Sequence, residues 1–166
     1  MRKELFEFRH IVKHIGGHAA LRDVSLRLYQ DEITFLVGRG SGRSVLSQMM
    51  MGELTPDSGT MLLLEKPYQP LSPEKAHERG IFCVTQNTKL IQNLSLSENI
   101  YIARPLSGIW HRGQADAFAR MACQECGIQL DLSKKASHVK LIDTLMVYCL
   151  RALLVRAQLL ILDNLL

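Results

Sequence analysis

The stretch Phe35–Ser44 reads Phe-Leu-Val-Gly-Arg-Gly-Ser-Gly-Arg-Ser and joins an apolar run to a glycine-rich turn. The apolar run, residues 33–37, is typical of a strand buried on both faces, and a helical pattern follows from Arg43 to Met51. Between a strand and a helix, such a turn presents successive backbone N–H groups to phosphate, while a Lys reaches the outer phosphates and a hydroxyl ligates Mg²⁺. The stretch therefore predicts an anion-binding turn.

This turn departs from the usual pattern G-x-x-x-x-G-K-[ST] in length and in its cation. If Gly42, Arg43 and Ser44 fill the last three places, the first falls on Val37, and an opening at Gly38 requires the loss of one residue. Arg43 replaces the Lys, and a planar guanidinium does not simply substitute for a compact ammonium. We expect this turn to bind nucleotide weakly, with the Ser44 hydroxyl as a ligand of Mg²⁺. The predicted site consists of Gly38, Gly40, Ser41, Gly42, Arg43, Ser44 and Val45. In the alternative interpretation, the glycines only let a helix pack close to a sheet.

The composition favours one globular domain, residues 1–166, in a reducing cytoplasm. Hydrophobic residues make up 47% and charged residues 22% of the 166 positions. The net charge of +4 is carried by scattered Lys and Arg, so nucleic-acid binding is not expected. No apolar run approaches about 18 residues, so direct membrane insertion is not expected and any membrane association requires a partner. The four cysteines follow no secretory leader.

The cysteines and histidines do not predict a metal site. Cys123 and Cys126 have C-x-x-C spacing, but a zinc site needs a second ligand pair and a redox pair should open a helix rather than close one. We expect two ordinary thiols. His10, His14 and His18 recur every four residues in a segment that is predicted to be strand and turn, so we expect solvated side chains.

Alternating and continuous apolar runs predict strands, and helical spacing with capping signals predicts helices between them. The pattern indicates an α/β fold with a mainly parallel sheet, flanking helices and an antiparallel N-terminal β subdomain. The expected strands are residues 5–13, 24–28, 33–37, 60–64, 81–85 and 159–162. The expected helices are residues 43–51, 72–80, a stretch opening at Ser97-Glu98-Asn99, an apolar stripe 115/118/119/122/126, and a second stripe 141/145/149/153.

Read in order, these segments resemble the ATP-binding-cassette (ABC) family of transporter ATPases, and more narrowly the subunits that energise monosaccharide importers. The segments that carry the resemblance are 20–26, 54–59, 72–81, 93–100, 151–154 and 159–163, together with the phosphate-loop-like turn. The resemblance implies a P-loop NTPase-like fold with ATP and Mg²⁺ as cofactors. It also implies that Gln86 is the glutamine of the Q-loop, near the Mg²⁺ shell, and that Asp163 is the Walker B aspartate.

Several positions depart from the family pattern. Asn164 stands where the family has its catalytic glutamate, and an amide cannot accept a proton from the attacking water. Val139–Asp143 stands where the family has its LSGGQ signature, without the serine and glycines that approach the γ-phosphate of a partner. Ile15 stands where an aromatic ring usually stacks on adenine. These departures predict weak nucleotide binding and defective hydrolysis.

The resemblance implies two partners, a transporter membrane subunit and a second ATP-binding domain. It places the chain in the cytoplasm, peripheral on the inner face of the cell membrane. Two alternatives stay open: an active or residually active ATPase that energises sugar import, and a decayed fragment without nucleotide function. The chain stops at Leu166, before the family's D-loop and switch histidine, and this end is either natural or a truncation.

Overall fold

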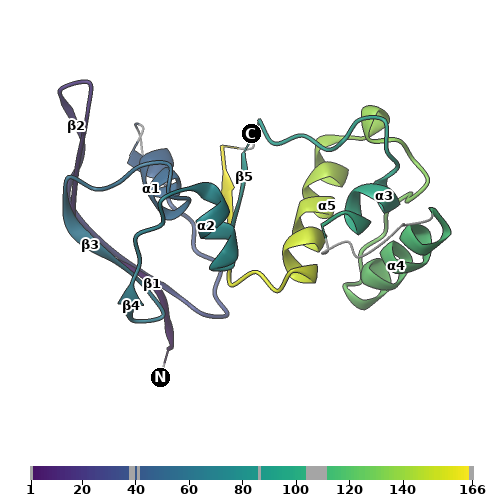
Figure 1. Cartoon of the computed structure of the whole chain (residues 1–166), viewed down its shortest axis with the longest axis horizontal. Coiled ribbons are helices and arrows are strands. Elements are labelled where there is room, and N and C mark those ends of the chain that lie inside the picture. Colours follow the sequence, from purple (N-terminus) through teal and green to yellow (C-terminus); the bar gives the residue numbers. More distant parts are fainter. Residues whose placement is uncertain (1, 38–39, 41, 86, 104–111, 165–166) are drawn as a thin grey trace. The chain divides into compact units, whose positions relative to one another are not determined.

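The computed structural model describes residues 2–37, 40, 42–85, 87–103 and 112–164 (Figure 1). It consists of two compact units, Met1–Cys83 and Val84–Leu166, and each is described by itself. The first unit is built on a four-stranded sheet, and the second is mainly helical.

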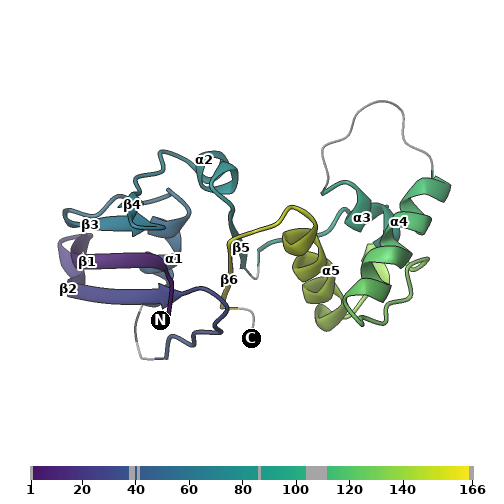
Figure 2. The ribbon, with the colours of Figure 1, turned by 90° about the horizontal axis from the view of Figure 1, so that it is seen from below.

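An antiparallel hairpin opens the first unit. Strand β1 (Glu4–Ile15) pairs with β2 (His18–Tyr29) through the Gly16-Gly17 turn, where φ is 57° and 79°. A two-residue hairpin turn of this type requires positive φ at both positions, which glycine adopts at least cost. Two further strands complete the order β2-β1-β3-β4 (Figure 2), namely β3 (Ser58–Leu63) and β4 (Lys66–Pro67). The predicted antiparallel N-terminal β subdomain is confirmed.

The core of the first unit lies between this sheet and helix α1 (Gly42–Met50). Phe6 and Phe8 are fully buried with ring centroids 4.9 Å apart, and Phe6 meets the Tyr68 ring edge-on at 5.2 Å. The Tyr68 hydroxyl donates a 2.6 Å hydrogen bond to the carbonyl of Met50, the last residue of α1. This bond ties the end of the helix to the loop that follows β4, so the helix after the glycine-rich turn is held at its far end.

Local signals place the next elements where the sequence predicts them. Helix α2 (Pro73–Glu78) has Pro at its first position, and the Ser72 side chain accepts from the Lys75 amide. Gly80, with φ of 78°, follows its end. Strand β5 (Ile81–Thr85) then begins, and the boundary between the two units falls inside it.

The predicted strand at residues 33–37 is not formed. The segment has no secondary-structure assignment, and its alternating apolar side chains are exposed: Ile33 by 86%, Phe35 by 82% and Val37 by 89%. A strand exists only through the hydrogen bonds of a neighbour, and no described strand pairs with this segment. The apolar composition of residues 33–37 therefore led to a wrong strand prediction.

The second unit contains the remaining elements. They are α3 (Leu96–Tyr101), α4 (Arg112–Glu125), the 3₁₀ turn η1 (Ala136–His138), α5 (Leu141–Leu154) and β6 (Leu159–Asp163), which forms a two-stranded sheet with β5. Helix α3 begins at Leu96, one residue before the predicted opening, because Ser95 and Glu98 form a reciprocal capping box. The described core of this unit includes Val84, Leu90, Leu96, Ile100, Ala119, Ala122, Val147 and Leu150.

The buried faces of the two longer helices follow the predicted stripes only in part. On α4 the alanines at 115, 119 and 122 are buried, whereas Cys126, just beyond the helix, is exposed. On α5 the predicted stripe is wrong, because Leu141 and Leu153 are more than half exposed while Val147 and Leu150 are fully buried. Apolar residues occur on several faces of α5, so their spacing alone could not identify which face packs against α3 and α4.

Candidate functional site

The glycine-rich turn is described at Gly40 and from Gly42 onward, whereas Gly38, Arg39 and Ser41 lie outside the described residues. Gly40 has φ of 94°, and no atom lies within 4 Å of where its Cβ would be. The need for glycine at this position is therefore conformational rather than steric. At Gly42 a Cβ would lie 3.2 Å from Leu21 Cδ2. The helix thus starts in close contact with β2.

The first turn of α1 separates the predicted site residues by burial. Arg43 is exposed, Ser44 is half-buried, and Val45 is buried in the core. The first backbone N–H groups of a helix have no partner within it and attract anions, together with the helix dipole. Arg43 can therefore add a solvent-accessible cation at this end of α1. Val45 can contribute only its backbone, since its side chain packs inward.

The turn that precedes β3 is fastened to β1 through Asp57. Its carboxylate accepts from Lys13 Nζ at 2.8 Å and from the His14 backbone N–H at 2.7 Å. The hydrogen bonds from Lys13 and His14 lower the pKa of Asp57 to about 2. Two residues on, Gly59 has φ of 96°, and a Cβ there would lie 2.4 Å from the His10 carbonyl oxygen. The segment therefore requires the Asp57 carboxylate and, at position 59, a residue without a side chain.

The hairpin tip carries Ile15, which the sequence analysis places at the position expected to stack on adenine. Ile15 is 45% exposed and pairs with His18 across the turn. The predicted solvated character of the histidines holds in part, because His10 Nδ1 lies 2.7 Å from Asp23 and His14 Nδ1 lies 3.1 Å from Asp57, all at exposed positions. These contacts are on the surface of the hairpin.

The end of β6 presents the two C-terminal site residues. Asp163 is the last residue of the strand and is half-buried. Asn164 follows it, is exposed, and has φ of 52°, in the left-handed region that asparagine adopts more readily than most residues. Gln86 lies outside the described residues. The predicted chemical roles of these three residues stay predictions.

The start of α5 contains the residues that the sequence analysis places at the family signature. Leu141 and Ile142 are 51% and 54% exposed, so two apolar side chains lie at the surface there. The Lys140 backbone N–H donates to Asp143 Oδ2 at 3.3 Å, which makes Asp143 part of the N-terminal cap. A carboxylate in the first turn complements the helix dipole. Asp143 therefore has a structural partner at this site.

Two polar residues that sequence reasoning did not single out join α3 to α5. Asn99 is fully buried, and its backbone carbonyl accepts from Arg151 Nε at 2.7 Å. Arg151 Nη2 also donates to Asn99 Oδ1 at 3.0 Å. Burial lowers the pKa of the Arg151 guanidinium. Both residues fall in segments that carried the family resemblance, but neither an isolated Asn nor an isolated Arg in a helix indicates such a contact.

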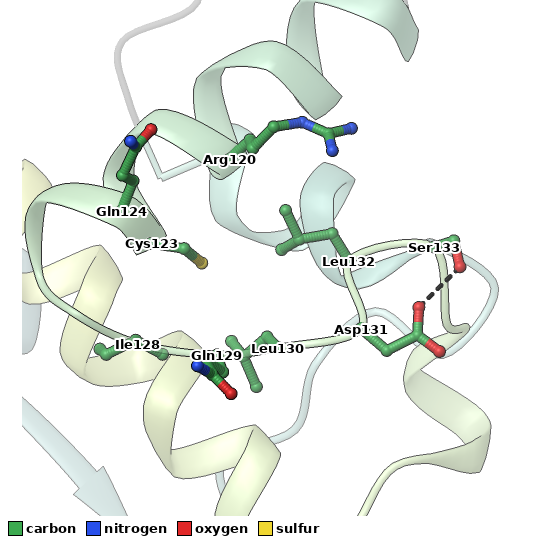
Figure 3. A pocket seen from close by; sticks show the side chains of 9 residues that line it. All are labelled: Arg120, Cys123, Gln124, Ile128, Gln129, Leu130, Asp131, Leu132 and Ser133. Carbon is green, nitrogen blue, oxygen red and sulfur yellow. Dashed lines mark hydrogen bonds between the residues drawn. The ribbon is translucent and has the colours of Figure 1, made fainter.

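The described part of the second unit also has a hollow of about 700 Å³ beside the end of α4 (Figure 3). Ser133 Oγ donates to Asp131 Oδ1 at 2.7 Å on its rim. The buried Cys123 thiol faces this hollow, and burial raises its pKa, so it is a poor nucleophile. The lining side chains are those of Arg120, Cys123, Gln124, Ile128, Gln129, Leu130, Asp131, Leu132 and Ser133.

The described residues contain neither a candidate metal cluster nor a candidate membrane span. Among those residues, no three His, Cys, Asp or Glu side chains are grouped so that they could hold a metal ion. Within the same residues, every helix is too short or too polar to span a bilayer.

Comparison with known proteins gives consistent matches. The family model described as "ABC transporter" matches residues 21–166. The chain is 35% identical over 161 residues to the autoinducer 2 import ATP-binding protein LsrA of Enterobacter sp. (strain 638), covering 96% of this chain and 32% of that protein. It is 32% identical over 163 residues to the ribose import ATP-binding protein RbsA 2 of Escherichia coli O157:H7, with the same coverage. The chain thus spans about a third of the length of these curated relatives.

Solved structures give the same fold. A nucleotide-free ATP-binding cassette from an ABC transporter superposes with a TM-score of 0.78 at 20% identity, over 98% of this chain and 70% of that one. The ADP conformation of an ATP-binding cassette superposes with a TM-score of 0.76 at 22% identity, over 95% and 67%. The α/β fold of the P-loop NTPase type is therefore confirmed.

Proposed function

Because this chain belongs to the ABC transporter family, we propose that residues 1–166 form a nucleotide-binding domain of the sugar-importer type that binds nucleotide weakly and is defective in hydrolysis. The observation that carries the proposal is that the family model matches residues 21–166, although several residues expected to bind or hydrolyse ATP are altered. The relatives named above for ribose and autoinducer 2 import support the importer type.

The binding half of the proposal depends on the start of α1. Its first backbone N–H groups, exposed Arg43 and the Ser44 hydroxyl can meet the phosphates and Mg²⁺ of ATP. Arg43 holds an anion through a planar fork, whereas the usual Lys acts as a compact charge on a flexible stem. The altered cation and the missing loop residue support weak rather than tight binding.

The hydrolysis half depends on residues 139–143 and 164. Asn164 cannot act as a general base, and loss of a positioned base costs roughly 10²- to 10⁴-fold in rate. At the start of α5, exposed Leu141 and Ile142 offer no hydrogen bond to a phosphate, and Asp143 adds negative charge. Loss at two independent positions multiplies, so little turnover is expected from this chain alone.

The proposal includes partners and a location. We infer that the chain works beside a transporter membrane subunit and a second ATP-binding domain that retains catalytic residues, on the cytoplasmic face of the membrane. We propose ATP and Mg²⁺ as its ligands, with Mg²⁺ reached by Ser44, Gln86 and Asp163 through the nucleotide.

Titration with MgATP followed by a phosphate-release assay tests this function. Saturable binding at millimolar or lower nucleotide without release is the expected result. Asp163→Ala should weaken the Mg²⁺-dependent part of binding, whereas Asp131→Ala, an exposed aspartate on the rim of the α4 hollow, should leave binding unchanged. Absence of any saturable binding would contradict the proposal and leave only an interaction module or a decayed fragment.

Residual ATPase activity is the second candidate, and retained Ser44 and Asp163 favour it. In that case phosphate release should be measurable with the unmodified chain. It should disappear in Asp163→Ala and persist in Asp131→Ala. Release that persists in both variants would indicate a contaminating ATPase.

A further inference from the structure

In the segment between β5 and α3, residues 87–95, one buried side-chain amide makes several of the hydrogen bonds. Asn99 Oδ1 accepts from the Ile91 backbone N–H at 2.9 Å, and Asn99 Nδ2 donates to the Ile91 carbonyl at 3.0 Å. The same Nδ2 donates to the Ser95 carbonyl at 3.0 Å. Asn99 therefore pairs with Ile91 as a neighbouring strand would, and one side chain replaces a backbone ladder.

Arg151 fixes this amide from the neighbouring helix. Its Nε and Nη2 atoms donate to the carbonyl and the Oδ1 of Asn99, at 2.7 and 3.0 Å. The guanidinium carbon lies 5.1 Å from the centroid of the Tyr148 ring, one turn earlier on α5. The planar fork of an arginine makes these two bonds from two nitrogen atoms in fixed directions, whereas a lysine has a single donor nitrogen on a flexible stem.

The opposite side of the segment is bonded to η1. The backbone N–H of Ala136 donates to the Leu94 carbonyl at 3.0 Å, and that of Ser137 donates to the Gln92 carbonyl at 3.2 Å. An antiparallel bridge joins Ser95 to Lys135. The segment is therefore bonded on one side to Asn99 of α3, which in turn accepts from Arg151 of α5, and on the other side to the turn directly before residues 139–143.

From these contacts we infer that Asn99 and Arg151 are positioning residues that couple the segment following Gln86 to both flanks of Val139–Asp143. Its functional meaning rests on the proposed function, in which a second ATP-binding domain meets the start of α5. Any displacement of α5 then reaches Ile91 through Arg151 and Asn99, because a helix moves as a rigid element and the amide has no spare bonding capacity. Asn99 and Arg151 do not touch reacting atoms, so their role is positional.

Backbone hydrogen exchange on the full chain without nucleotide tests this inference. Arg151→Lys is expected to raise the exchange rates of the Ile91, Ala136 and Ser137 amides roughly tenfold, although the Nε and Nη2 atoms of Arg151 donate to Asn99. The change loosens Asn99, which accepts from Ile91, and with it the segment whose Leu94 and Gln92 carbonyls accept from Ala136 and Ser137. Arg120→Lys changes an exposed arginine on α4 in the same way and should leave these rates unchanged. Amides of the β1–β2 hairpin serve as an internal reference, since a uniform rise there as well would indicate general destabilisation.

A second pair of variants removes the amide itself. Asn99→Ala should raise exchange at Ile91 directly and at Ala136 and Ser137 indirectly, whereas Asn93→Ala, at an exposed position in the same segment, should change neither. If Arg151→Lys or Asn99→Ala does not fold, exchange of the unmodified chain in low urea decides instead. Amides of Ile91 and Ala136 should then open together with those of α5.

Two results would overturn the inference. One is that the amides of Ile91 and Ala136 exchange at the same rates in Arg151→Lys as in Arg120→Lys. The other is that, in the unmodified chain, the Ile91 amide opens independently of the amides of α5. Because no nucleotide is present, absence of MgATP binding would refute the proposed function without touching this result, and unchanged exchange would refute the coupling while nucleotide binding stands.

Discussion

In each unit one polar side chain makes several of the hydrogen bonds that fasten a connecting segment, and the two side chains differ in burial and charge. In the first unit, Asp57 is 40% exposed and binds Lys13 and His14 of β1. In the second unit, Asn99 is fully buried and binds Ile91 and Arg151. Water can replace the partners of Asp57 when they are removed, whereas it cannot easily reach those of Asn99.

This difference in burial and charge determines how strongly each contact depends on salt and pH. A neutral amide inside the helical unit gives geometry that depends little on salt or pH, because its bonds involve uncharged acceptors and an arginine that stays protonated. A carboxylate at the surface gives a contact that acid and salt can weaken. We therefore expect the largest effects from changes at Asn99 and progressively smaller ones toward the surface.

Removal of the buried amide should have the largest effect on stability. Asn99→Ala removes the side-chain partner of the Ile91 backbone groups and of Arg151 Nη2, so the free energy of unfolding should fall by about 3 kcal/mol. The change is measured by urea unfolding followed by circular dichroism at 222 nm, the usual wavelength for helix content. Asn93→Ala, at an exposed position, should change it by less than about 0.5 kcal/mol. Equal losses in the two variants would mean that burial of Asn99 carries no special weight.

A side chain at Gly59 should have the next largest effect. Its φ of 96° and the 2.4 Å approach of a Cβ to the His10 carbonyl mean that Gly59→Ala must shift backbone atoms. We expect a loss of about 2 kcal/mol in the free energy of unfolding. Gly113→Ala is the matched control, because Gly113 lies in α4 with no atom within 4 Å of a Cβ. That variant should gain about 0.5 to 1 kcal/mol through helix propensity, and a loss similar to Gly59→Ala would contradict the steric argument.

Local chemistry made much of the fold predictable from sequence. Gly16-Gly17 requires a hairpin turn whatever surrounds it, and Ser72 with Pro73 starts a helix through bonds made within four residues. The order of family-like segments identified the fold, and the family match across residues 21–166 agrees with it. Such signals depend on neighbours in the chain, so they can be read without coordinates.

Features that depend on distant partners were not predictable in the same way. Residues 33–37 have the composition of a buried strand, yet strand formation needs hydrogen bonds from another segment. The buried face of α5 includes Val147 and Leu150 because of what packs on it, whereas spacing favoured Leu141 and Leu153. The Asn99–Arg151 contact joins positions 52 residues apart, and no local pattern announces it.

Asp57 should contribute less to the free energy of unfolding than Asn99, and this contribution should be lost in acid. The pKa of Asp57 is about 2 in the folded chain, below the ordinary value of 3.8 for this side chain. A lowered folded pKa means that the stabilising contribution is present above about pH 4 and is lost as the pH falls toward about 2, because the unfolded chain binds the proton first. The difference in unfolding free energy between the unmodified chain and Asp57→Asn should therefore shrink over this range. A difference that stays constant from pH 5 to about 2 would show that the carboxylate charge contributes nothing.

Arg43 should have the smallest effect on stability and a specific effect on binding. Its side chain is exposed at the start of α1, so Arg43→Ala should change the free energy of unfolding by less than about 0.5 kcal/mol. Loss of a cation beside the first N–H groups of the helix should still weaken MgATP or sulfate binding roughly fivefold. Arg120→Ala removes an equally exposed arginine from α4 and should leave the titration unchanged. Isothermal titration calorimetry distinguishes the two variants. Equal affinity in both would remove Arg43 from the anion site, and the start of α1 would then bind anions through its backbone alone.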